Sequence, residues 1–100
     1  MDMKSDLFSG FIRIHILYHA SKGRVYGSWL MEELGRHGYR VGCGTLYPLL
    51  HRLLEDGYLG CKSEKVGGKI RKYYRITAKG RRAVAEARVR IRELISELEE

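Results

Sequence analysis

The sequence predicts a mainly α-helical domain that carries a single β-hairpin. Apolar residues recur at the spacing of a helix face in four stretches, residues 7–20, 26–37, 44–56 and the segment beyond 77. Residues 58–64 and 70–76 instead have the character of strands, and the Gly67-Gly68 pair between them is typical of a tight hairpin turn. A chain of 100 residues is long enough for one domain with a modest core.

Composition and charge narrow the class of protein. The formal net charge is +7 and the pI is near 9.6, which suits an anionic partner such as nucleic acid. The bases concentrate between Lys62 and Arg82, where Glu64 is the one acid. No apolar run approaches the ~20 residues of a membrane span, so we expect a cytoplasmic protein with no membrane contact. Cys43 and Cys61 are too few for a disulfide framework and are expected to be free thiols.

The first predicted helix, residues 7–20, is apolar on more than one side. One stripe consists of Leu7, Phe11, Ile14 and Tyr18, and much of the remaining surface is covered by Phe8, Ile12, Ile16 and Leu17. A helix of this kind needs partners on more than one side. In so small a domain we expect the second partner to be another copy of the chain.

Residues 26–37 and 44–56 predict two short helices joined by a tight connection that contains Gly38. The second of these helices has a leucine face, made by Leu46, Leu49, Leu50 and Leu53, and an opposite face made by Thr45, Pro48 and Arg52, with Tyr47 and His51 between the two. This layout matches a helix-turn-helix, whose second helix enters the major groove. If Thr45 is the N-cap, Pro48 falls in the first turn and costs little. If the helix starts at Gly42 or Cys43, Pro48 removes one backbone hydrogen bond.

The hairpin and the last helix complete the predicted domain. The hairpin tip carries Lys65, Lys69 and Arg71, which makes it a basic wing. Thr77 is the expected N-cap of the last helix. Apolar residues of that helix keep the spacing of a coiled-coil seam, at Val84, Ala87, Ile91, Leu94 and Leu98. We therefore expect it to join two copies of the chain.

Three motifs occur in order along the chain. They are Gly44-Thr45-Leu46-Tyr47-Pro48-Leu49-Leu50-His51-Arg52-Leu53, then Asp56-Gly57-Tyr58-Leu59, then Arg71-Lys72-Tyr73-Tyr74-Arg75-Ile76-Thr77-Ala78-Lys79-Gly80. Together they resemble the PadR family of bacterial and archaeal transcriptional regulators. The resemblance implies a winged helix-turn-helix homodimer that represses transcription from a pseudo-palindromic operator. Residues 1–78 would form the DNA-binding domain with its N-terminal helix, and residues 79–100 the dimerisation helix. It implies no enzyme activity and no cofactor. The resemblance leaves open whether a small-molecule effector is a further partner, and which one.

The predicted contacts with double-stranded DNA come from the second helix of the helix-turn-helix and from the wing. They are Thr45, Tyr47, Pro48, His51 and Arg52 on the helix, and Lys65, Lys69, Arg71 and Lys72 on the wing. Arg52 could pair with guanine, while hydroxyls and lysines hold phosphates. The predicted dimer interface consists of Phe8, Phe11, Ile12, Val84, Ala87, Ile91, Leu94 and Leu98.

Two other functions are consistent with the same fold. His15 and His19 lie one helical turn apart, a spacing that can chelate a metal ion, so a metal-responsive DNA-binding sensor is one alternative. The sequence shows no cysteine or carboxylate placed to complete that site, so we expect buried or interface histidines and no bound metal. The second alternative is a winged-helix module that binds another protein. No convergent set of acid, base and nucleophile is visible, and an enzyme is not expected.

Overall fold

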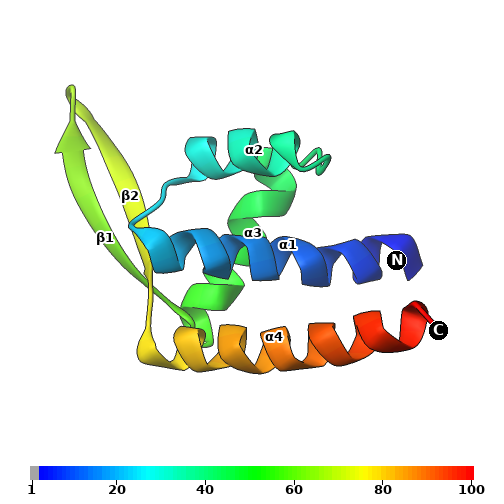
Figure 1. Ribbon diagram of the computed structural model, residues 1–100. Coiled ribbons are helices and arrows are strands. Elements are labelled where there is room, and N and C mark those ends of the chain that lie inside the picture. The colour runs from blue at the N-terminus through cyan, green and yellow to red at the C-terminus, as the bar shows by residue number, and fades with distance from the viewer. Residues whose placement is uncertain (1–2) are drawn as a thin grey trace.

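The computed structural model describes residues 3–100, and side chains from Asp6 onward. Its elements are α1 (Met3–Lys22), α2 (Gly27–Arg36), α3 (Cys43–Glu55), β1 (Leu59–Val66), β2 (Lys69–Ile76) and α4 (Ala78–Leu98). The mainly helical class with one hairpin, predicted from sequence, is confirmed. In Figure 1, α1 and α4 lie side by side in opposite directions, α2 lies on the other side of α1, and the hairpin projects from the end remote from both termini.

The core forms where α1, α2, α3 and the base of the hairpin meet. Its fully buried members include Ile16, Leu30, Leu34, Leu46 and Leu50. The core also contains Ile12, which is only 7% exposed. This corrects the expectation of a dimer contact at Ile12, because a side chain enclosed within its own protomer has little surface left for a partner.

The turn between α2 and α3 follows the predicted pattern. Gly38 has a φ of +88°, and the next residue, Tyr39, donates its backbone N–H to the carbonyl of Leu34 at 2.9 Å, which closes the helix end. Helix α3 starts at Cys43 with Gly42 as an N-cap that offers no side-chain hydrogen bond. The option with Thr45 as N-cap is therefore wrong.

The early start of α3 places Pro48 inside the helix. A proline has no N–H to donate to the carbonyl four residues earlier, so the carbonyl of Gly44 loses its helical partner. Gly44 is an exposed residue. Burial of Leu46 and Leu49 in the core offsets the lost bond.

The hairpin pairs β1 with β2 in antiparallel register, from Leu59 opposite Ile76 to Val66 opposite Lys69. Gly67 and Gly68 both have positive φ, +57° and +81°, as a two-residue type I′ turn requires. The base of the hairpin is buried and its tip is exposed.

Two junctions fix the hairpin to the helices. Val25, in the segment before α2, exchanges two backbone hydrogen bonds with Tyr74 at 2.9 and 2.7 Å, an isolated β-bridge that ties this segment to β2. The hydroxyl of Thr77 accepts the N–H of Gly80 at 3.1 Å, which confirms it as the N-cap of α4, and donates to the carbonyl of Gly57 at 2.6 Å. Within residues 3–100, no helix has the length and apolar character needed to cross a membrane.

Candidate nucleic-acid interface

The two faces of α3 divide as the sequence predicts. Leu46, Leu49, Leu50 and Leu53 are buried against the core. The residues predicted to face DNA are all exposed, namely Thr45, Tyr47, Pro48, His51 and Arg52. His51 lies 3.5 Å from Glu55 on the same helix, whereas no described side chain forms an ion pair with Arg52. The front of α3 is therefore a free polar and basic surface.

Tyr47 also has a structural contact. A Cβ placed on Gly27, the first residue of α2, would come within 2.8 and 2.9 Å of the Cζ and Cε1 atoms of the Tyr47 ring. The ring thus lies directly against the N-terminus of α2, while 44% of the residue stays exposed. Tyr47 therefore helps to set how α3 crosses α2, and its hydroxyl oxygen is the atom that lies nearest to Gly27.

An interlocked set of aromatic and basic side chains holds the wing against the helices. The guanidinium of Arg24 stacks on the Tyr73 ring at 3.9 Å, and that of Arg71 stacks on the Tyr26 ring at 4.0 Å. The two tyrosine rings meet edge to face at 5.7 Å. Arg24 also pairs with Glu64 of β1 at 2.5 Å. The segment before α2 and both strands are therefore tied together.

These contacts change the charge balance of the wing. Hydrogen bonding from Arg24 lowers the pKa of the Glu64 carboxyl, so it stays ionised and paired. Glu64 is the one acid between residues 59 and 76, and its charge is taken up by Arg24. Lys65, Lys69 and Lys72 are exposed. Arg71, predicted as a phosphate contact, is half-buried on Tyr26 and is held in place by that stacking.

A cleft of about 480 Å³ lies between the wing and the helix-turn-helix. Lys69 and Lys72 line one side of it, and Gly27, Ser28 and Tyr47 line the other. Helix α2 has no side-chain cap at this end, so its first backbone N–H groups are available to an anion. Lysine ammonium groups opposite uncapped N–H groups form a suitable environment for a phosphate.

The residues predicted for the dimer interface fall into two sets, apart from Ile12 in the core. Phe8, Phe11, Leu94 and Leu98 are exposed on α1 and α4, with Leu98 75% exposed. Val84, Ala87 and Ile91 are half-buried and line a cavity of about 530 Å³ between these helices. Large apolar side chains thus remain uncovered on α1 and α4.

Sequence reasoning missed several residues that shape this interface. Arg24, Tyr26 and Tyr73 anchor the wing, but their pairing joins segments almost fifty positions apart and has no local signature. The role of Gly27 has no local signature either, because the Tyr47 ring that would meet a Cβ there comes from the next helix. His37 lies together with His15 and His19, although it is 18 positions beyond His19 and no spacing in the sequence links it to them.

The exposed front of α3, the turn before it and the anchored basic hairpin define a winged helix-turn-helix protein. Comparison with known proteins then gives the family. The model of the transcriptional regulator PadR-like family matches residues 16–86. Among curated proteins, "Transcriptional regulator Rv3488" of Mycobacterium tuberculosis is 51% identical over 87 residues, which cover 87% of this chain and 81% of that protein.

Solved structures show the same likeness. A PadR family transcriptional regulator from Eggerthella lenta superimposes with a TM-score of 0.84 at 32% identity, over 96% of this chain and 85% of the other. A PadR-like transcriptional regulator from Bacillus cereus gives 0.84 at 31% identity, over 94% and 93% of the two chains. The chain belongs to the PadR-like family of transcriptional regulators. Its relatives are regulators and not enzymes.

Proposed function

We propose that the protein is a homodimeric repressor that binds a pseudo-palindromic operator through α3 and the wing. The observation that carries the proposal is the exposed polar face of α3, with Arg52 unpaired among the described residues, beside a basic wing that is tied to the same domain. Because the proposed target is operator DNA, the proposal also implies that the protein acts in the cytoplasm.

In this proposal α3 reads bases in the major groove. Arg52 is exposed, unpaired among the described residues, and carries the planar fork that fits guanine O6 and N7. The hydroxyls of Thr45 and Tyr47 hold phosphates and fix the register of the helix on the duplex. His51 and Pro48 make the remaining surface contacts along the groove.

The wing supplies contacts with the DNA backbone. Lys65, Lys69 and Lys72 bind phosphates, and the cleft beside Lys69 and Lys72 accepts one phosphate against the start of α2. Arg71 contributes charge at the same edge while its stacking on Tyr26 keeps the wing at a fixed angle. These contacts give affinity without sequence preference.

The two copies pair through α1 and α4. Phe8, Phe11, Leu94 and Leu98 supply exposed apolar surface on these neighbouring helices, and Val84, Ala87 and Ile91 extend it inward. A two-fold dimer built on this surface would present two α3 helices to major grooves about 34 Å apart.

Footprinting of the DNA upstream of the protein's own gene, repeated at two salt concentrations, tests the proposal. We expect two protected half-sites one helical turn apart and weaker protection at higher salt. A reporter gene placed behind the protected sequence should fall in expression when the protein is present. Absence of salt-sensitive duplex binding would favour a protein-binding module, and a rise in reporter expression would contradict repression.

A further inference from the structure

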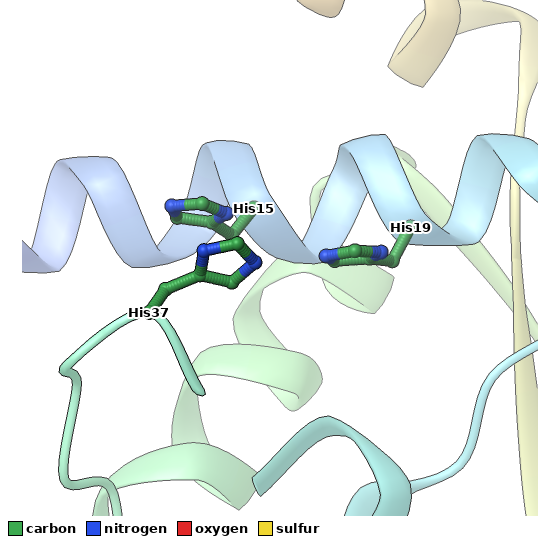
Figure 2. A group of neighbouring side chains, drawn as sticks. All are labelled: His15, His19 and His37. Atoms are coloured by element: carbon green, nitrogen blue, oxygen red, sulfur yellow. The ribbon is translucent and has the colours of Figure 1, made fainter. Parts of the chain in front are cut away.

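Three histidines from two helices converge on one side of α1. His15 and His19 come from successive turns of α1, and His37 follows the last residue of α2. One ring nitrogen of each lies within 4.8 Å of the others. The ring centroids of His15 and His37 are 4.8 Å apart, and His19 lies 6.2 Å from His37. Figure 2 shows the rings of His15 and His37 close together and the ring of His19 farther along α1.

This spacing is close to what a metal ion requires. With metal–nitrogen bonds of about 2.0–2.1 Å, tetrahedral ligands lie roughly 3.4 Å apart. Each nitrogen pair must therefore close by no more than about 1.4 Å, which rotation of the side chains can provide. His37 sits at a helix end with 46% of its side chain exposed, so it has room to move.

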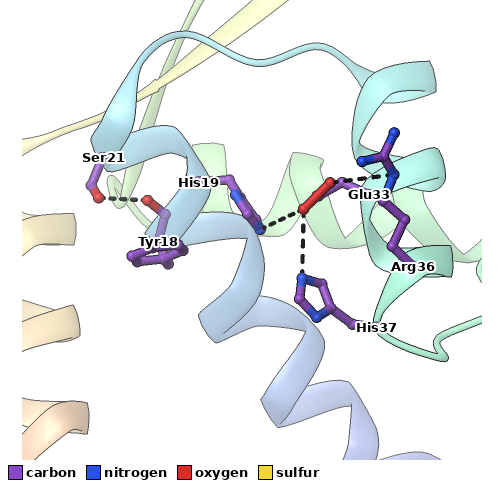
Figure 3. A network of polar contacts seen from close by, with 6 residues as sticks. All are labelled: Tyr18, His19, Ser21, Glu33, Arg36 and His37. Carbon is purple, nitrogen blue, oxygen red and sulfur yellow. Dashed lines mark hydrogen bonds and ion pairs between the residues drawn. The ribbon is translucent and has the colours of Figure 1, made fainter.

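A carboxylate beside two of the three histidines is a candidate fourth donor. The Glu33 Oε2 atom lies 3.7 Å from His19 Nε2 and 3.5 Å from His37 Nε2, already near the separation of two ligands on one ion (Figure 3). Its other oxygen is 3.8 Å from Nε of Arg36, which steadies the carboxylate. Glu33 is on α2, one turn before His37, and its side chain is only 18% exposed.

The surroundings favour the neutral imidazoles that bind metals. Burial, together with neighbouring His37, lowers the pKa of His15 and His19 below the usual value, while Glu33 acts in the opposite direction. The rings are also held by aromatic neighbours, Trp29 at 5.5 Å from His19 and Tyr39 at 5.4 Å from His15. Imidazole and carboxylate ligands suit zinc, cobalt and nickel better than magnesium or calcium.

We propose that His15, His19, His37 and Glu33 bind one divalent transition-metal ion per protomer, and that the bound ion changes operator affinity. The site joins α1 to α2, the helix that packs against α3. The three histidines also line the cavity between α1 and α4, which gives an ion a path to the site. Metal binding would hold the helix-turn-helix in one position relative to α1 and α4, the two helices proposed to form the dimer interface. Only this regulatory step rests on the proposed DNA-binding function.

Titration of the metal-free, untagged chain with Co²⁺ tests the site directly. We expect visible absorption bands of tetrahedral Co²⁺ that saturate at one ion per protomer, and their loss when Zn²⁺ is added. His37→Ala should weaken Co²⁺ binding by more than ~10- to 100-fold, which is the typical loss on removing a residue that only supports a metal ligand. Glu33→Gln should weaken it by at least about 10-fold.

His51 is the matched control, because it is the one histidine of the four outside the cluster. His51→Ala should bind Co²⁺ like the wild type. Each variant is first checked for native helical circular dichroism, and Zn²⁺ should raise the Tm of the wild type and of His51→Ala but not of His37→Ala. Equal losses for His51→Ala and His37→Ala, or no tetrahedral bands, would overturn the site.

The regulatory step has a separate readout. Operator affinity of the wild type should change at least about 5-fold when Zn²⁺ is added, the lower end of a typical coupling between sites, and stay constant for His37→Ala. An unchanged wild-type affinity would overturn the regulation and leave the site standing. If no operator is bound with or without Zn²⁺, the proposed DNA-binding function fails, and the Co²⁺ result still decides the site.

Discussion

Replacing Gly80 with alanine should loosen the junction between the wing and α4. A Cβ at this buried position would meet the backbone carbonyl of Tyr58 and approach Cγ1 of Ile76 to 2.6 Å. The carbonyl belongs to the chain just before β1, so it cannot swing aside like a flexible side chain. The methyl group therefore fits only if α4 moves away from the base of the wing.

The expected magnitude is a balance of two effects. Overpacking of this kind costs about 1–3 kcal/mol, and more where backbone must move. Alanine in a helix gains up to about 1 kcal/mol over glycine. Because backbone must move here, the overpacking cost lies at the upper end of its range, and the net loss is about 2 kcal/mol, equivalent to a fall in Tm of roughly 8–16 °C for a domain of this size.

Gly35→Ala is the matched control for this substitution. Gly35 lies in α2, is exposed, and has no atom within 4 Å of an added Cβ, so only the helix preference remains. It should be neutral or raise stability by up to about 1 kcal/mol. Thermal unfolding of both variants at one protein concentration measures the contrast. A Gly80→Ala protein as stable as Gly35→Ala would refute the proposed tight contact.

Three further outcomes test the interface and the wing. In gel-shift titrations, Arg52→Ala should weaken binding to operator DNA by about 1–3 kcal/mol and binding to random DNA much less. Lys69→Ala should weaken binding to both DNAs equally and reduce the slope of log affinity against log salt concentration by about 1. Equal losses on both DNAs for Arg52→Ala would show that Arg52 does not read bases. The Arg24 pairing lowers the pKa of Glu64, so its contribution to stability is present above the usual glutamate pKa and is lost as pH falls through the lowered value. The free energy of unfolding, measured in urea at a series of pH values, should therefore fall less at acidic pH for Glu64→Gln than for the wild type. The same pH dependence in both proteins would contradict this. Leu94→Glu should give folded monomers in sedimentation, because Leu94 is 52% exposed in the protomer and a charge there would lie in the proposed dimer interface. An unchanged oligomeric state would show that the interface does not include Leu94.

The sequence by itself determined the elements whose cause is local. The leucine face of α3 follows from helical spacing, the turn at Gly67-Gly68 follows from the need for positive φ, and the cap of α4 follows from a hydroxyl at Thr77. Each depends on residues within a few positions of one another. Periodicity and turn chemistry therefore predicted the fold class and the exposed side of α3.

The tertiary structure decided what depends on how the elements cross. Helix α3 starts at Cys43, a choice that sequence alone left open, and the buried Leu46 donates its backbone N–H to the carbonyl of Gly42 at 2.9 Å. Helix α1 is apolar on several sides, and the side that carries Ile12 faces the core because it is the side that packs on α2 and the sheet. His37 lies near His15 and His19 only because the C-terminal end of α2 packs beside α1. Spacing along the chain describes one helix at a time, and contacts between helices appear only once burial of their apolar faces has set the packing.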